Sequence, residues 1–118
     1  MSIISITIDI ICIDIVYLQK TKMSKACNYI PWILPFLKTI SDENRLKIIC
    51  VLKEWEKCVN HIVKITDLPQ NLVSHHLKKL KEAEIVIATK EGLNVRYKIN
   101  HKKVDEYLKE FDELFGLN

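Results

Sequence analysis

The chain has 118 residues, which is enough for one domain of ordinary size and too few for two domains with separate cores. Hydrophobic residues make up 48% of it and charged residues 28%, so we expect it to bury a core and to fold. Only two glycines occur, Gly92 and Gly116. This excludes the glycine-rich dinucleotide-binding turn and the phosphate-binding loop, and with them the nucleotide-dependent enzymes that use either motif.

The net charge of +3 is unevenly distributed along the chain. Residues 74–103 contain eight lysines and arginines against three acidic residues, whereas residues 104–118 contain one lysine against five acidic residues. The basic stretch favours a polyanionic partner, and the acidic end disfavours one there. Taken alone, the charge is explained more simply by a solvated lysine-rich face.

The cysteines and the hydropathy pattern both favour a cytoplasmic protein. The four cysteines form no Cys-x-x-Cys pair, which favours a reducing compartment over a disulfide-stabilised secreted fold. Asp9 and Asp14 interrupt the apolar N-terminus, so that no run of 18 apolar residues exists. We therefore expect neither a membrane span nor a signal peptide.

Residues 1–22 form an atypical isoleucine-rich extension. Eight isoleucines fall within the first fifteen positions, largely at every second residue, which is typical of a strand. A lone strand of this kind would be an exposed edge in need of a partner. Two interpretations stay open: translation starts at Met23 and the extension is not part of the natural protein, or the extension is an arm that pairs in a dimer. The remaining residues, 23–118, are expected to form one domain.

Three helices are predicted in the first half of that domain. The first covers residues 28–40, with a late start or a kink because of Pro31 and Pro35. Ser41 or Asp42 offers the N-cap of the second helix, which ends near Lys53. A short third helix covers residues 59–65 and is followed by a tight turn at residues 66–69. The apolar side of the second helix is assigned to Leu46, Ile49, Cys50 and Leu52.

A polar-faced helix, a hairpin and a last helix are predicted after this turn. Pro69 opens a helix that ends near Ala83 and buries one apolar face that includes His76. Two β-rich runs, 85–89 and 95–99, flank a turn in which Gly92 can adopt a positive φ. Asn100 then caps a helix with an apolar stripe, made of Val104, Tyr107, Leu108, Phe111, Leu114 and Phe115.

This order of elements is that of a winged helix-turn-helix module, a mainly α fold with a β-hairpin wing (α+β). A helix that presents Gln, Asn, Ser and Lys suits the major groove of double-stranded DNA, and a basic hairpin suits the adjacent backbone or minor groove. Winged helices also dock proteins, so a protein-interaction module is the alternative. An enzyme is not expected, because the neighbours Ser74 and His75 have no oxyanion loop and no third orienting group.

Three blocks of sequence resemble the ArsR/SmtB family of metal- and stress-responsive repressors. They are residues 37–49 (LKTISDENRLKII), residues 74–86 (SHHLKKLKEAEIV) and the wing residues 90–97 (KEGLNVRY). The resemblance spans about residues 30–115 and implies a homodimer joined by the first and last helices. The interface residues expected from it are Ile33, Leu37, Tyr107, Leu108, Phe111, Leu114 and Phe115.

The resemblance also implies which residues face DNA. Two copies in a dimer would read half-sites roughly 34 Å apart, which implies an inverted-repeat operator. Glu84 departs from the family, which usually has glycine after this helix, and puts the local turn in doubt. The residues expected to contact DNA are Gln70, Asn71, Ser74, His75, Lys78, Lys79, Lys90, Asn94 and Arg96.

The resemblance indicates the effector, the ligand that releases the repressor from DNA, less clearly than it indicates the DNA-facing residues. The family's Cys-Val-Cys metal site appears here as Cys58-Val59-Asn60, followed by His61, so one thiolate is replaced. Cys27 could complete a set of Cys27, Cys58 and His61 across the dimer for zinc, cadmium or arsenite. The favoured alternative treats Cys58 as a half-buried small hydrophobe and His61 as an ordinary polar residue.

Two other sensing modes of the family fit less well. The family's zinc site on the last helix lacks its histidines here, because none follows His101. Cys50 resembles a family redox thiol without its partner, and we expect it to pack in the core. The sequence thus predicts a cytoplasmic, homodimeric winged-helix repressor released from its operator by a metal ion or a thiol-reactive effector. A constitutive DNA binder without an effector and a protein-interaction module are the alternatives.

Overall fold

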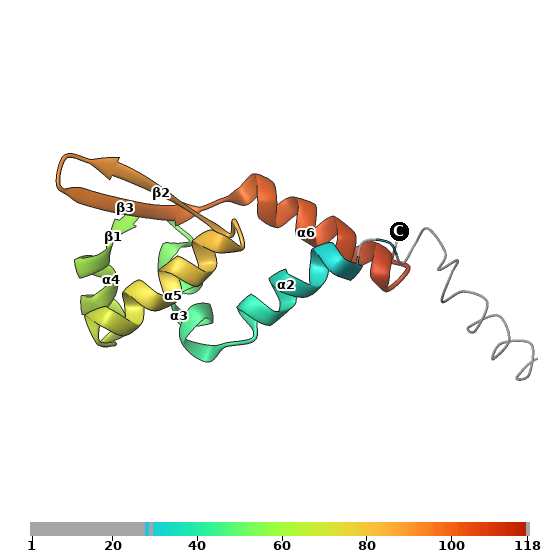
Figure 1. Ribbon diagram of the computed structural model, residues 1–118, viewed down its shortest axis with the longest axis horizontal. Helices are drawn as coiled ribbons and strands as arrows, with labels where there is room; N and C mark the ends of the chain where they lie inside the picture. Colours follow the sequence, from blue (N-terminus) through green and yellow to red (C-terminus); the bar gives the residue numbers. More distant parts are fainter. Residues whose placement is uncertain (1–27, 29, 118) are drawn as a thin grey trace, which may run out of the picture.

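A computed structural model describes residue 28 and residues 30–117, so the isoleucine-rich extension and Cys27 lie outside the described residues. The elements and their order agree with the mainly helical winged fold that the sequence predicts (Figure 1). They are α2 (Ile30–Ile40), α3 (Glu43–Leu52), β1 (Lys57–Cys58), α4 (Val59–Thr66), α5 (Gln70–Glu82), β2 (Val86–Glu91), β3 (Asn94–Ile99) and α6 (His101–Leu114).

Local side-chain hydrogen bonds define the ends of several helices. Asp42 is the N-cap of α3, and its carboxylate accepts from the backbone N–H of Arg45 at 3.1 Å. Asn100 caps α6 in the same way, accepting from the backbone N–H of Lys103 at 3.3 Å. Asp67 ends α4 in the left-handed region with a φ of 57°. Both predicted caps and the turn after α4 are therefore confirmed.

Helix α2 begins two residues later than the predicted residue 28 and accommodates both of its prolines. The helix begins at Ile30, so Pro31 lies in the first turn, where its missing N–H is not needed. Pro35 lies inside the helix and cannot donate to the carbonyl of Pro31. The carbonyl of Pro35 itself accepts an additional hydrogen bond from the Thr39 hydroxyl at 2.7 Å.

The wing belongs to a three-stranded antiparallel sheet with the order β1-β3-β2. The hairpin register pairs Glu91 with Asn94 and leaves Gly92 and Leu93 as a two-residue turn. Gly92 has a φ of 60°, while Leu93 is not among the residues with positive φ, as in a type II′ turn. The short strand β1 was not predicted, since two residues carry no periodicity; it places Cys58 opposite Arg96.

The core lies between α3, α4, α5 and the base of the hairpin. The side chains that are fully buried there are Ile48, Leu52, Ile62, Val73, Leu77, Leu80 and Ile85. The predicted inner face of α3 is wrong in part, because Ile48 takes the buried position while Leu46 and Cys50 are exposed. The sequence ENRLKIICVL offers apolar residues around most of the helix, so its periodicity alone does not identify the buried side.

Helices α2 and α6 lie side by side at one end of the molecule (Figure 1). Phe36 of α2 stacks on Tyr107 of α6 with 4.5 Å between ring centroids. The other faces of this helix pair leave large apolar side chains exposed: Trp32, Leu34, Leu108, Leu114 and Phe115. Within the described residues, no helix is both long enough and apolar enough to span a membrane.

Candidate nucleic-acid interface

Helix α5 has one buried and one exposed face, as its sequence predicts. Pro69 precedes its first turn, and Val73, His76, Leu77 and Leu80 face the core. All polar and basic side chains of the opposite face are exposed: Gln70, Asn71, Ser74, His75, Lys78, Lys79 and Lys81. Hydrogen-bond donors and acceptors thus share this face with positive charge, which suits both base edges and phosphates.

The wing adds polar and basic side chains that differ in how far they are exposed to a DNA partner. Lys90 and Asn94 are exposed near the hairpin tip. Arg96 is half-buried, and its Nε lies 3.3 Å from Oε1 of Glu56 in an ion pair that does not satisfy hydrogen-bond geometry. Glu56 was not predicted to matter, because it becomes a neighbour of Arg96 only through the pairing of β1 with β3. Glu56 therefore already forms an ion pair with Arg96, one of the side chains predicted to contact DNA.

A polar cluster beneath α5 joins it to α3. The Nε of Arg45 donates to Nδ1 of the buried His76 at 3.2 Å. The other ring nitrogen, Nε2, has no hydrogen-bond partner among the described residues and lies 4.0 Å from Oδ1 of Asp42. Burial is the main cause that lowers the pKa of His76, and the Asp42 carboxylate opposes it. His76 is thus a core histidine as predicted, satisfied on one nitrogen only.

The C-terminal end of α5 is tied to α6. Glu84 has a φ of 61°, which explains why glycine would be the easier residue at this turn. Its carboxylate pairs with Nζ of Lys103 at 3.3 Å, and this contact is the main cause that raises the pKa of Lys103. The hydroxyl of Tyr107 donates to the backbone carbonyl of Ala83 at 3.0 Å. The departure from the family's glycine is accommodated, and the predicted turn is retained.

The two predicted metal ligands within the described residues line different hollows. Cys58 is half-buried at the N-cap of α4 and lines a hollow of about 220 Å³ with Gln70 and Asn94. His61 is exposed and lines a different groove of about 640 Å³, together with Cys50 and Trp55. Within residues 30–117 no three His, Cys, Asp or Glu side chains are grouped to hold a metal ion. The third candidate, Cys27, lies outside the described residues.

Cys50 is exposed, so the prediction that it packs in the core is wrong. Its position on α3 places it at the groove that His61 also lines, and not among the buried side chains. The apolar run IICVL around it suggested burial, but Ile48 and Leu52 are the members of that run that face the core.

The predicted dimer residues divide into three groups by their burial. Ile33 is 1% exposed and Tyr107 is 9% exposed, so both lie in the core of the single chain. Leu37 and Phe111 are half-buried against that core. The remaining three are exposed on α6 or just beyond it: Leu108, Leu114 and Phe115.

The family model described as bacterial regulatory protein, arsR family, matches residues 42–88, from the N-cap of α3 into β2. The cadmium resistance transcriptional regulatory protein CadC of Listeria innocua is 39% identical over 98 residues, which cover 81% of this chain and 82% of that protein. The arsenical resistance operon repressor of Staphylococcus aureus is 33% identical over 72 residues, covering 61% of this chain and 69% of that protein.

The fold is also shared with solved structures. A homodimeric winged helix-turn-helix DNA-binding domain from Mycobacterium bovis, a possible ArsR-family regulator, matches with a TM-score of 0.63 at 22% identity. The match covers 73% of this chain and 81% of that domain. The chain belongs to the ArsR family of bacterial regulatory proteins and is a DNA-binding transcriptional regulator, not an enzyme.

Proposed function

We propose that the protein is a cytoplasmic, homodimeric repressor that binds an inverted-repeat operator in double-stranded DNA. The observation that carries this proposal is the exposed polar and basic face of α5, together with the exposed Lys90 and Asn94 of the wing, of which Asn94 lines one hollow with Gln70 of α5. Gln70, Asn71 and Ser74 supply groups for base edges, while the lysines supply salt-sensitive attraction to phosphates. Residues 23–118 are the unit to which we assign this function.

The dimer is proposed to form through α2 and α6. Leu108, Leu114 and Phe115 are large apolar side chains exposed on and just after α6, and exposed apolar surface is typical of a protein interface. The related M. bovis domain is homodimeric. In a two-fold dimer the two α5 helices would reach half-sites about one helical turn apart, roughly 34 Å.

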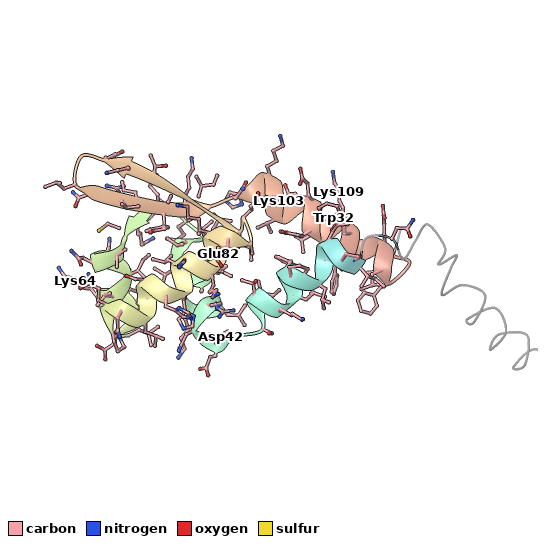
Figure 2. The ribbon with its side chains drawn as sticks, in the orientation of Figure 1. Trp32, Asp42, Lys64, Glu82, Lys103 and Lys109 are labelled. Carbon is pink, nitrogen blue, oxygen red and sulfur yellow. The ribbon has the colours of Figure 1, made fainter. Side chains whose placement is uncertain are left out.

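The DNA contact is tested with a charge-matched pair of variants. Lys78 lies on the outward face of α5, whereas Lys109 lies on α6 (Figure 2), and each substitution by Gln removes one positive charge. Fluorescence anisotropy would use the best DNA selected from a random library, compared with a scrambled sequence, at two salt concentrations. We expect Lys78→Gln to weaken binding about threefold to tenfold and to reduce the salt slope by about 1 per half-site, because a phosphate contact is lost.

Lys109→Gln is expected to bind like the wild type. Equal effects of the two substitutions would indicate only a general charge effect and would contradict the assignment of α5. A folded wild-type dimer that does not prefer the selected DNA would favour the protein-interaction module instead. That alternative also predicts no effect on DNA binding when Lys78, Lys79, Lys90 and Arg96 are all neutralised.

A thiophilic metal ion is the proposed effector, held by Cys58 and His61 with Cys27 as the third ligand. Support comes from the relatives named for cadmium and arsenical resistance and from the place of Cys58. Its hollow is shared with Gln70 of α5 and Asn94 of the wing, so a ligand on this thiol would lie against both DNA-facing elements. The three donors would suit zinc, cadmium or arsenite.

Two cysteine variants test the effector. Cys58→Ser is expected to abolish cadmium-thiolate absorbance in the near ultraviolet and cadmium-induced release of DNA, whereas Cys50→Ser is expected to retain both. Loss of neither property in Cys58→Ser would contradict the assignment of Cys58. Unchanged DNA binding with cadmium, zinc and arsenite would identify a constitutive DNA binder.

A further inference from the structure

Arg45 spans the space between α2 and α5. Its backbone N–H donates to Asp42, which fixes the first turn of α3. Its guanidinium donates in two directions, from Nη1 to the backbone carbonyl of Thr39 in α2 at 3.1 Å and from Nε to Nδ1 of His76 in α5 at 3.2 Å. The rigid, planar guanidinium therefore joins the last turn of α2 to the middle of α5.

The packing of the helices gives this bridge its importance. Helix α2 packs mainly against α3 and α6, whereas α5 packs mainly against α3, α4 and β2. A shift of α2 therefore reaches α5 largely through α3, and Arg45 is the α3 residue that donates to both neighbours. Neither Arg45 nor the buried His76 belongs to the exposed face of α5.

His76 is chemically suited to receive this bond. An imidazole that accepts on Nδ1 is neutral and carries its proton on Nε2. Nε2 lies 4.0 Å from Asp42 Oδ1, and within the described part of the chain the contact to Arg45 is the one hydrogen bond of this ring. Removing it would leave a buried ring without a partner and α5 without its link to α2.

We propose that Arg45 is a positioning residue for DNA recognition, which holds α5 at a fixed orientation to α2 through His76 and Thr39. The inference rests on the proposed function, in which α5 reads DNA and α2 belongs to the dimer. Two reading helices match successive grooves only when each keeps its orientation to the dimer helices. Losing the bridge should therefore reduce the preference for the operator more than the general attraction to DNA.

The bridge itself is tested in the protein without DNA. A long-range ¹H–¹⁵N spectrum reports which nitrogen of His76 carries the proton at pH 8. We expect the Nε2-protonated tautomer in the wild type and a shifted Nδ1 resonance in Arg45→Lys. A wild-type ring protonated on Nδ1 could not accept from Arg45 and would overturn the inference.

The effect on recognition is tested with Arg45→Lys, which keeps the charge but cannot span both acceptors with a planar fork. The ratio of affinities for selected and scrambled DNA is expected to fall about tenfold, while affinity for scrambled DNA stays within about twofold. Lys47→Arg is the matched control, because Lys47 lies exposed on the same helix and pairs only with Glu43 at 3.2 Å. The affinity ratio of Lys47→Arg should equal that of the wild type.

Two substitutions of His76 separate positioning from mere folding. His76→Leu removes the acceptor and should lower the ratio of affinities for selected and scrambled DNA as Arg45→Lys does. His76→Gln keeps an acceptor oxygen and should retain most of the wild-type ratio. An unchanged ratio in His76→Leu, or losses explained by reduced helix content or dimerisation, would overturn the positioning role. A wild type without sequence preference would overturn the proposed function instead, and the tautomer measurement would still decide whether the bridge exists.

Discussion

The part of the molecule from α3 to β3 and the α2–α6 pair differ in how many of their apolar side chains are buried. In the first part, Ile62, Leu77 and Leu80 are completely buried within one chain. In the second, Phe36 and Tyr107 stack on each other, while apolar side chains on the remaining faces stay exposed. The exposed positions include Trp32, Leu34, Leu108 and Phe115.

This difference corresponds to the two proposed roles of the chain, which are contact with DNA and formation of a dimer. The α3–β3 part supplies most of the buried core, to which α2 and α6 add Ile33, Phe36 and Tyr107. In the proposed function this part presents α5 and the wing to DNA, whereas the exposed apolar side chains of the helix pair are available to a partner. The spacing of two DNA-reading surfaces would then depend on the helix pair, and their chemistry on α5 and the wing. Polar ties connect the parts: Arg45 joins α2 to α5, and both Tyr107 and Lys103 join α6 to the end of α5.

The largest effect is expected inside the buried core. Leu77→Ala removes a fully buried side chain of α5 and should lower the free energy of unfolding by about 2–5 kcal/mol, measured by chemical denaturation. Leu93→Ala, at the exposed tip of the wing, should change it by less than about 0.5 kcal/mol. A small effect at Leu77 would show that this part does not depend on its own core.

The next largest effect is expected on the helix pair. Leu108→Glu places a charge on the exposed apolar surface of α6 and should raise the dimer dissociation constant about 100-fold, because the charge must be desolvated at an interface. Sedimentation velocity measures this dissociation. Leu93→Glu adds the same charge on the wing and should leave the dimer intact. Equal oligomeric states in both variants would refute the proposed interface.

A smaller effect is expected at the tie between α6 and α5. Tyr107→Phe keeps the ring on Phe36 but loses the hydrogen bond to the carbonyl of Ala83. We expect the free energy of unfolding to fall by about 0.5–1.5 kcal/mol in denaturant titrations. A variant as stable as the wild type would mean that this hydroxyl does not help to connect the two parts.

The smallest expected effect concerns pH. Burial is the main cause that lowers the pKa of His76 in the folded state. The charges of Arg45 and His75 also lower this pKa, and the Asp42 carboxylate raises it, so that folding favours the neutral ring. The resulting stability is fully present above the unfolded pKa of about 6.5 and is lost as the pH falls through the folded pKa. Denaturant titrations from pH 8 to pH 5 should show this loss, and His76→Gln should show less of it. An identical profile in both proteins would exclude His76 as a source.

Much of the fold could be predicted because its signals are local. Asp42 and Asn100 cap helices within three residues of their own position, and the two faces of α5 follow from helical periodicity. The inner side of α3 could not be predicted, since its apolar residues surround the helix. Exposed Cys50 and buried Ile48 are only two positions apart within that run.

The parts of the site that depend on distant residues could not be predicted. Arg96 meets Glu56 only because β1 pairs with β3, and β1 is too short to leave a pattern. Arg45 and His76 are 31 positions apart, and nothing in their spacing indicates a hydrogen bond. Cys58 and His61 are close in sequence, yet they line different hollows, which their spacing does not indicate.

The central claim is that two copies of this chain read DNA with their α5 helices at a spacing set by the helix pair. Hydroxyl-radical footprinting on the DNA selected from a random library tests it most directly. The account predicts two protected segments related by an inverted repeat, with centres about one helical turn apart, roughly 34 Å. A single protected segment, or uniform protection without a repeat, would contradict it.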